Sequence, residues 1–487
     1  MSFATASYQD TFTSLSPATG EVVWRGRAAG EHDIAAAVTA ARDAQRAWGR
    51  TPIQERIGVA QRFAGCAAEC EAELADIISR ETGKPLWEAA SEARLVPAKV
   101  RLAIQALHER TGDHAIELPQ GFGRVIHRPL GVVAVLGPFN FPAHLPNGHI
   151  VPALLAGNAV VFKPSEYTPA TGDLLVEIWR EAGLPDGVLR VCHGARPTGS
   201  SLVSGDIDAV FFTGSAAGGQ AIHRALAGRP DVLLALEMGG NNPLVIHEVC
   251  DLDAAAYLTA ISAFITAGQR CTCARRLILP DGPAVAPLLD RLVAVASSLR
   301  VGPPTHEPEP FYGPVIHAEA GRRILGAQAD WLQRGAAPLL RAEARSDNAA
   351  LISPGILDVT DRDGPDDGEV FGPLLQVIRV PDFNAAIDEA NRTRFGLAAS
   401  LLSDDAACFS TFRERVRAGI VNWNQPTTGA SGRLPFGGLG ASGNHRPSGY
   451  HVADFCADAT AAVESHTLEA PASTPPGIST APLERPN

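Results

Sequence analysis

Two cysteines, Cys271 and Cys273, lie one residue apart in the segment AGQRCTCARR, with an arginine before them and two arginines soon after. Three kinds of chemistry could use such a pair: a metal site, a disulfide or a nucleophilic thiolate. The CxC spacing is not that of structural zinc sites, and no partnering CxxC or HxxxH follows. A disulfide between cysteines two residues apart would be strained. We therefore predict no metal site here.

Two inert buried thiols stay open as an alternative, because cysteines are commonly buried. Gly268 and Gln269 argue against it, since they place the cysteines in a loop at the end of an apolar helix. Arg270 can lower the pKa of a neighbouring thiol. The segment by itself therefore makes a reactive cysteine a candidate and leaves the inert pair open.

A carboxylate and an amide lie where strands are expected to end. Glu237, in LEMGGNNP, follows an apolar strand, and a buried carboxylate can act as a general base near neutral pH. Asn140, in GPFNFP, lies in a proline-bracketed loop and could donate to a developing oxyanion. A helix-capping acid and a turn asparagine are the alternatives.

Two further segments could bind phosphate and ribose. In FFTGSAAGG a strand leads through a glycine turn, Gly214 to Gly219, into a helix whose N-terminal N–H groups suit a pyrophosphate. The G-x-x-x-x-G spacing differs from the usual G-x-G-x-x-G, and a plain turn would need glycine as well. In VFKPSE, Lys163 and Glu166 could both contact a ribose diol, or form a charged pair in a surface loop.

The elements that must position these residues alternate between strands and helices. Helical periodicity predicts helices over 33–48, with Asp33 as N-cap, over 53–80 and over 85–110. From residue 130, short apolar runs alternate with helices, and the same rhythm restarts after residue 243. Such runs are typical of parallel sheets covered on both faces. We predict an α/β fold with two α/β domains.

The composition is that of a folded protein, with 45% apolar and 19% charged residues in a chain of 487. Its formal net charge of −12 argues against nucleic acid as a partner. We expect no targeting segment and no membrane span, so no membrane partner. Eight cysteines in a chain of this length do not suggest a disulfide framework, and we predict a reducing cytoplasm.

Seven motifs in this order, PFNFP, FKPSE, FTGS, LEMGG, GQRC, EVFGP and PFGG, resemble the aldehyde dehydrogenase superfamily over about residues 10–456. The resemblance implies a Rossmann-type NAD domain, an α/β catalytic domain and a small β oligomerisation arm. NGHIVPALLAGN, EMGGNNP and PFGGLGASGNHRPS resemble a branch that oxidises an N-succinylated semialdehyde with NAD in arginine degradation. NAD is favoured over NADP because Glu166 should repel the extra phosphate.

The resemblance assigns roles to single residues. Cys271 matches the nucleophile, with Cys273 at a flanking position, Glu237 the general base and Asn140 the oxyanion donor. Residues that match cofactor contacts are Lys163, Glu166, Gly214, Ser215, Ala216, Ala217, Gly218, Gly219, Glu369 and Phe371. Asn241 departs from the family, since many relatives have lysine there.

The expected substrate carries two carboxylates besides its aldehyde. Arginine suits carboxylate binding, so the candidates for holding them are Arg270, Arg433, His445 and Arg446. Alternatives are the oxidation of another acidic semialdehyde (succinic or glutamic), a CoA-acylating enzyme, and a non-catalytic relative. A CoA-acylating enzyme is expected to lack the base, and a non-catalytic relative to lack the cysteine or the base. Glu237 and Cys271 are both present.

The resemblance also divides the chain. Residues 1–112 and 128–236 are expected to form the NAD-binding domain and 237–447 the catalytic domain. Residues 113–127 and 448–466 are expected to form the arm, whose exposed strand edge would need a partner strand. A homodimer or homotetramer follows from that. Residues 467–487 are rich in Pro, Ser and Thr and are predicted to be a poorly ordered tail.

Overall fold

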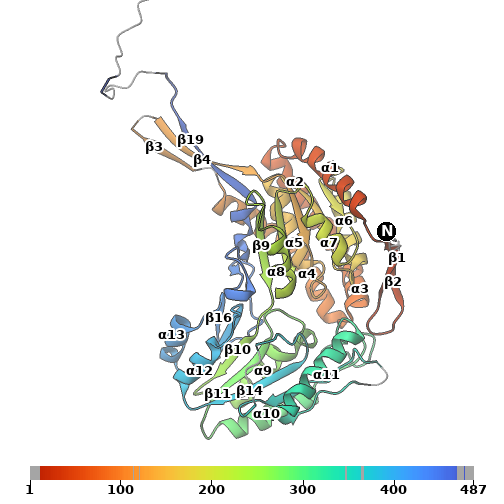
Figure 1. Cartoon of the computed structure of the whole chain (residues 1–487), viewed down its shortest axis with the longest axis vertical. Helices are drawn as coiled ribbons and strands as arrows, with labels where there is room; N and C mark the ends of the chain where they lie inside the picture. Colours follow the sequence, from red (N-terminus) through yellow and green to blue (C-terminus); the bar gives the residue numbers. More distant parts are fainter. Residues whose placement is uncertain are drawn as a thin grey trace, which may run out of the picture.

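Two helix-covered sheets and a projecting arm make up the computed structural model of the chain (Figure 1). The structure describes residues 11–112, 114–119, 121–345, 348–362, 367–468 and 476–477. Nearly all of the predicted tail over 467–487, and the first ten residues of the predicted NAD domain, lie outside these ranges.

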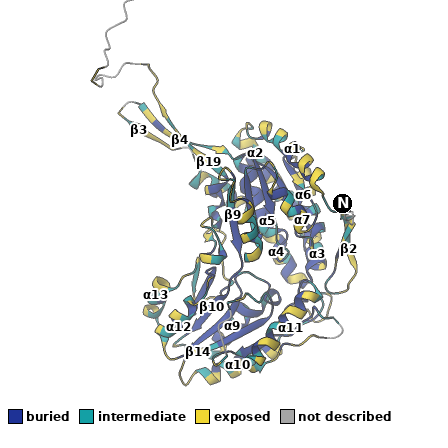
Figure 2. Ribbon diagram, in the orientation of Figure 1, coloured by how far each residue is buried: buried dark blue, intermediate teal, exposed yellow. Residues whose placement is uncertain are grey.

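The first sheet has five parallel strands in the order β7-β6-β5-β8-β9. Their bounds are β5 Val132–Leu136, β6 Ala159–Lys163, β7 Leu189–Val191, β8 Ala209–Gly214 and β9 Leu233–Met238. Every residue of β5 and β6 is buried, as apolar runs without alternation predict (Figure 2).

Helices cover both faces of this sheet. They are α1 Glu31–Trp48, α2 Ile53–Glu69, α3 Glu71–Thr82, α4 Leu86–Arg110, α5 His144–Ala156, α6 Pro169–Glu181, α7 Arg196–Val203 and α8 Ala216–Ala225. Val133 and Val135 pack with α2, α4, α5 and α6, whereas Val132 and Ala134 pack with α1 and α7. Alternate residues of one strand therefore build the two cores, since strand side chains alternate between faces.

The strand order places β5 between β6 and β8, so successive crossovers run to opposite sides of β5. Ligands bind at such a switch point, outside the carboxyl ends of the strands. The loop carrying Asn140 follows β5, Lys163 ends β6 and Gly214 ends β8. The fold thus gathers three of the predicted segments at one edge.

The second sheet has seven strands in the order β12-β13-β14-β11-β10-β15-β16, all parallel except the edge strand β12. The strands are β10 Asn242–Ile246, β11 Ala274–Pro280, β12 Ala337–Leu340, β13 Gly355–Asp358, β14 Leu374–Val380, β15 Ala398–Leu402 and β16 Ile420–Trp423. Its helices are α9 Leu252–Phe264, α10 Val285–Ser298, α11 Ala318–Gln333, α12 Phe383–Asn391 and α13 Ala406–Arg415.

The arm is a three-stranded antiparallel sheet in the order β19-β4-β3 that projects from the body (Figure 1). Its strands are β3 His114–Leu118, β4 Gly121–Pro129 and β19 Ala457–Glu464. Ile116 and Val463 are exposed by 62% and 73%. The structure places the second arm segment later than the predicted 448–466. Residues 450–455 instead form a 3-10 helix whose Val452 and Phe455 are buried in the first core.

Short elements differ from the sequence predictions in instructive ways. Asp33 is the third residue of α1, not its N-cap, and its carboxylate accepts a hydrogen bond from the Gly30 N–H. The predicted helix over 53–80 breaks at Cys70 into α2 and α3. Two short hairpins, β1 (Thr11–Leu15) with β2 (Val22–Arg27) and β17 (Pro435–Phe436) with β18 (Ser448–Gly449), were not predicted.

All eight cysteines are free. Among the helices of the described ranges, none combines the length and apolar composition that a membrane crossing requires.

Candidate active site

A cavity of about 970 Å³ lies between the carboxyl ends of the first sheet and the second domain. Its volume suits a large organic ligand. The predicted site residues that line it are Asn140, Lys163, Glu166, Gly214, Ser215, Ala217, Gly218, Glu237, Cys271, Glu369 and Phe371. Ala216 and Gly219 are absent from this lining, as are all four residues predicted to bind substrate carboxylates.

The loop that carries the cysteines has an unusual backbone. After α9 ends, Thr266, Ala267 and Gly268 all have positive φ, at 59°, 52° and 70°. A Cβ on Gly268 would lie 2.1 Å from the carbonyl oxygen of Gly372 in the EVFGP segment. Glycine is therefore required at position 268, and the cysteine loop packs directly on EVFGP. Such costly backbone conformations cluster at functional sites.

Two buried side chains hold the carbonyls of this loop. Arg275 donates from Nη1 to the Gly268 carbonyl at 2.6 Å and from Nη2 to the Arg270 carbonyl at 3.0 Å. Asn242 donates from Nδ2 to the carbonyls of Cys271 at 2.7 Å and Cys273 at 2.9 Å. The sequence analysis missed both. The signal for Arg275 was a charged residue at the start of an apolar strand.

The structure separates the two cysteines. Cys271 lines the cavity, whereas Cys273 is fully buried and its Sγ donates to the Ile265 carbonyl at 3.7 Å. Burial raises the pKa of the Cys271 thiol well above its ordinary value, and the Glu237 and Glu369 carboxylates raise it further. The thiol therefore needs a base before it can attack.

The sequence suggested that Arg270 lowers the pKa of a neighbouring thiol, and it does so for the buried Cys273. At Cys271 the cation that opposes the raised pKa is Arg275. Arg270 instead forms an ion pair with Glu88 at 2.9 Å, donates to Thr266 Oγ1 at 2.7 Å and stacks over Phe141. Because its guanidinium is satisfied within the fold, it is also a poor candidate for a substrate carboxylate.

Glu237 lies near the end of β9 and is 4% exposed. Its Oε2 accepts a hydrogen bond from Ser448 Oγ at 2.6 Å, and its Oε1 has no hydrogen-bond partner in the part of the chain described. Burial raises its pKa to about 8, which the Ser448 hydroxyl and the Lys99 ammonium oppose. This value suits a general base near neutral pH. Lys99 and Ser448 were not predicted.

Asn140 is buried, and its Nδ2 donates to the carbonyl of Gln269 at 2.9 Å. Gln269 is fixed in turn, because its Oε1 accepts from the Ile316 N–H at 2.9 Å. An amide nitrogen has two N–H groups. Asn140 therefore ties its loop to the cysteine loop with one N–H and keeps the second for another acceptor.

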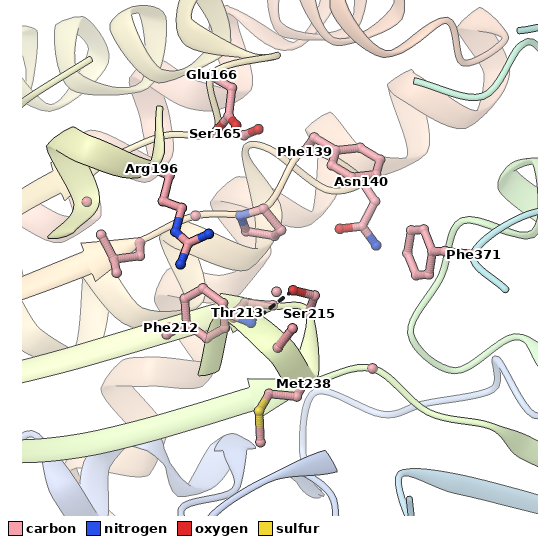
Figure 3. A pocket seen from close by; sticks show the side chains of 18 of the residues that line it. Phe139, Asn140, Ser165, Glu166, Arg196, Phe212, Thr213, Ser215, Met238 and Phe371 are labelled. Atoms are coloured by element: carbon pink, nitrogen blue, oxygen red, sulfur yellow. Dashed lines mark hydrogen bonds between the residues drawn. The ribbon is translucent and has the colours of Figure 1, made fainter. Parts of the chain in front are cut away.

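The opposite part of the cavity is built by the first domain (Figure 3). Lys163 donates from Nζ to the carbonyls of Pro164 and Gly194, and Glu166 lies 3.9 Å from that ammonium. Arg196, which the sequence analysis did not single out, extends into the same space as Glu166.

The start of α8 also faces the cavity. Ser215 caps the helix by accepting the Gly218 N–H at 3.1 Å, and the N–H groups of Ala216 and Ala217 in the same turn stay directed out of the helix end. Gly219 has a packing role instead, because a Cβ there would lie 2.3 Å from Met238 Sδ. Its lack of a side chain lets α8 approach β9.

Glu369 and Phe371 come from the EVFGP segment. Glu369 lies 3.5 Å from Arg275, and a Cβ on Gly239 would lie 1.7 Å from its Oε2. The second domain thus contacts the LEMGG segment through this carboxylate. Phe371 packs edge-on against Phe139 across the cavity, with 6.0 Å between the ring centroids (Figure 3).

The remaining substrate candidates lie at the surface. Arg433, His445 and Arg446 are exposed, and among the described residues the one hydrogen-bond partner of Arg446 is the carbonyl of His445, at 3.4 Å. Asn241, the residue that departs from the family pattern, is buried and donates from Nδ2 to Asp367 at 3.1 Å. It therefore links two loops of the second domain.

The family model for the aldehyde dehydrogenase family matches residues 3–461, so the chain belongs to the aldehyde dehydrogenase family. The chain is 52% identical over 468 residues, 96% of each chain, to the N-succinylglutamate 5-semialdehyde dehydrogenase of Paraburkholderia xenovorans. It is 51% identical over 469 residues, again 96% of each, to the enzyme of that name from Hahella chejuensis.

Solved structures agree with the fold. A 1-pyrroline-5-carboxylate dehydrogenase from Thermus with bound NAD is 29% identical, with a TM-score of 0.88 over 94% of this chain and 90% of that one. The glyceraldehyde-3-phosphate dehydrogenase GapN of Methanocaldococcus jannaschii, complexed with NADP, is 26% identical, with a TM-score of 0.87 over 93% and 98%. The predicted fold class and enzyme class are confirmed.

Proposed function

We propose that the chain oxidises N-succinyl-L-glutamate 5-semialdehyde to N-succinyl-L-glutamate with NAD, as a step of arginine degradation in the cytoplasm. The similarity at 51–52% identity over nearly the full length supports this substrate. The observation that carries the chemistry is that Cys271, Glu237 and Asn140 line one cavity although they are far apart in the sequence.

A nicotinamide dinucleotide fits the residues present. The start of α8 offers backbone N–H groups for a pyrophosphate. A Cβ on Gly214 would lie only 2.5 Å from the Phe212 ring, and one on Gly218 only 2.9 Å, so glycine at both positions is needed for this turn. Lys163 and Glu166 would hold the adenosine ribose, and Glu369 the nicotinamide ribose. When bound, the cofactor accepts the hydride of the aldehyde carbon.

The residues of the chain divide the remaining work. Glu237 removes the proton of the Cys271 thiol, and the thiolate attacks the aldehyde carbon. The oxyanion is held by the second N–H of Asn140 and by the backbone N–H of Cys271. Loss of hydride leaves a thioester on Cys271. Glu237 releases the thiol proton to solvent and then takes a proton from water, whose oxygen attacks the thioester carbon. The acid is released, and the expelled Cys271 thiolate recovers its proton from Glu237.

The substrate is tested by kcat/KM values measured side by side on N-succinylglutamate, succinic and glutamic semialdehydes. We expect the succinylated substrate to exceed both others by at least about tenfold. Equal values would overturn this substrate in favour of another acidic semialdehyde. Acyl transfer to CoA is disfavoured because Glu237 is in place to activate water; release of free acid without CoA checks this.

Specificity for NAD rests on Glu166, whose carboxylate should repel a 2′-phosphate. Arg196 lines the same part of the cavity, and its positive charge would attract a 2′-phosphate and so favour NADP. Rates at low concentrations of each cofactor distinguish them, and we expect NAD to be favoured.

We also propose the domain division and assembly implied by the family. Residues 1–112 and 128–236 form the cofactor domain, 237–447 the catalytic domain and the arm an oligomer contact. The exposed Ile116 and Val463 support a homodimer or homotetramer, because an uncovered apolar strand is an aggregation hazard. Light scattering on the purified protein tests this, and a monomer would refute it.

A further inference from the structure

The chain has 41 Lys and Arg residues, of which three are lysines. Lys99, on α4, differs from the other two in its hydrogen-bond and ion-pair partners. Lys84 forms an ion pair with Glu92 at 2.7 Å, and Lys163 donates to two carbonyls. Lys99 is half-buried, yet within the described ranges no hydrogen bond and no ion pair within 4 Å involves its ammonium. The neighbouring acid Glu92 on α4 does not pair with Lys99, because it forms its ion pair with Lys84.

The fold leaves room for this side chain beside α5. A Cβ on Gly148 would lie 3.0 Å from Lys99 Cε and 3.5 Å from its Nζ, so a larger residue would press on the ammonium. One turn further along α4, Leu102 approaches Gly432, whose Cβ would lie 2.9 Å from Leu102 Cδ1. Lys99 therefore lies among α4, α5 and the loop before β17.

Lys99 lies outside the lining of the cofactor cavity and packs against Gly148 of α5. Glu237 lines the cavity and Lys99 does not, yet the two groups interact electrostatically. The ammonium also acts on His144 and His149 of α5. An aldehyde that reaches Cys271 while the cofactor fills the cavity must enter from another side. Lys99, which packs against Gly148 of α5 outside the cavity lining, is the cation that acts electrostatically on Glu237.

Burial lowers the pKa of Lys99, and its ammonium form has no fixed counter-charge at neutral pH. Burial and nearby cations lower the pKa of both histidines to about 3, and burial raises the pKa of Glu237 to about 8. All three groups are then mainly neutral. The other nearby cations, Lys84 and Arg270, are already paired with carboxylates. A half-buried cation without an anion is unfavourable, and an incoming carboxylate removes that cost.

We propose that the Lys99 ammonium binds a carboxylate of the substrate, at a position between α4 and α5. The inference rests on the proposed function, because that substrate carries two carboxylates besides its aldehyde. It replaces Arg270, Arg433 and Arg446 as the residue that selects a charged aldehyde. Lysine has the reach for this from a helix, with a compact charge on a four-carbon stem.

The test compares the parent with Lys99→Met, which keeps the stem and removes the charge, and with Lys99→Arg, which keeps the charge. Each is assayed on the preferred carboxylated semialdehyde and on a neutral aliphatic aldehyde. We expect Lys99→Met to raise KM for the charged substrate by at least about tenfold, since hydrogen bonds to charged groups have that strength. The neutral aldehyde should change less than about threefold, and Lys99→Arg should be intermediate on the charged substrate.

Arg446→Ala is the matched control, because it removes an exposed cation, and we expect little change on either substrate. Equal losses on both aldehydes in Lys99→Met would overturn the proposal and make Lys99 a positioning residue for Glu237. Inhibition by the product N-succinyl-L-glutamate gives a second readout: its inhibition constant should rise in Lys99→Met, and an unchanged constant would also overturn it.

The two proposals can fail separately. If the parent does not favour the succinylated semialdehyde but Lys99→Met still loses activity only on carboxylated aldehydes, the substrate is wrong and the role of Lys99 stands. If the parent favours the succinylated semialdehyde and Lys99→Met shows no selective loss on carboxylated aldehydes, the substrate stands and the role of Lys99 is wrong. NAD binding and thermal unfolding of each variant confirm that it is folded.

Discussion

The hydroxyl of Ser448 should set the pH at which the base becomes active. Ser448 Oγ lies 2.6 Å from Glu237 Oε2 and 3.0 Å from the Phe436 carbonyl oxygen, and it has one proton to donate. When Glu237 is ionised, Ser448 donates to it. When Glu237 is protonated, the carboxyl can donate to Ser448, which then donates to Phe436. The Ser448 hydroxyl is thus hydrogen-bonded to Glu237 in both protonation states, but it stabilises the ionised carboxylate more than the protonated carboxyl.

The magnitude follows from the difference between these two bonds. A hydrogen bond to a charged group contributes about 1.5–3 kcal/mol and a neutral one about 0.5–1.5 kcal/mol, a difference of about 1.4 kcal/mol, or one pKa unit. Ser448→Ala should therefore raise the pKa of Glu237 from about 8 to roughly 9. At pH 7.5 the ionised fraction falls from about a quarter to about 3%, roughly eightfold.

The assay is kcat/KM against pH, because this ratio reports ionisations of the free enzyme. Because the base is the ionised form of an acid with a raised pKa, activity should rise with pH through about 8 in the parent. In Ser448→Ala the rise should move about one unit upward, and the two curves should meet above about pH 10. Ser448→Thr keeps a hydroxyl and serves as the control. A loss of the same size at every pH would refute the reasoning.

Three further changes follow from the site. Cys271→Ala should abolish turnover while NAD still binds, whereas Cys273→Ala should keep most activity; steady-state rates and NAD titration check both. Gly268→Ala should lower stability by about 1–3 kcal/mol and reduce turnover, because its φ is 70° and the new Cβ would meet the Gly372 carbonyl; an unchanged melting temperature would contradict this. Glu166→Ala should raise kcat/KM for NADP relative to NAD by about fivefold, the effect of one like charge at about 4 Å screened by water, about 1 kcal/mol; an unchanged ratio would place the discrimination elsewhere.

Local patterns in the sequence were sufficient for most elements. The apolar runs of β5 and β6 are buried on both faces, and the helix expected over 85–110 is α4, Leu86–Arg110. Boundaries failed where a short-range signal was ambiguous. Asp33 has the composition of an N-cap but acts from the third helical position, and nothing in the periodicity of 53–80 reveals the break at Cys70.

The sequence by itself determined the class of the protein and the residues able to react, because motif order and residue chemistry survive without coordinates. Cys271, Glu237 and Asn140 were candidates within their own segments, and the order of the seven motifs singled them out. Charge partners could not be chosen in this way. Arg270 is adjacent to the cysteine in sequence but is bound to Glu88, whereas Arg275, four residues after Cys271, holds the loop.

Only the tertiary structure decided the electrostatics of the site. The raised pKa of Glu237 comes from burial, and its partners Ser448 and Lys99 come from segments more than 130 residues away in the chain. Sequence spacing carries no information on such contacts, since desolvation and Coulomb interactions depend on distance in space. For the same reason, the exposed Arg446 and the half-buried Lys99 could be compared as carboxylate ligands only once their positions in the fold were known.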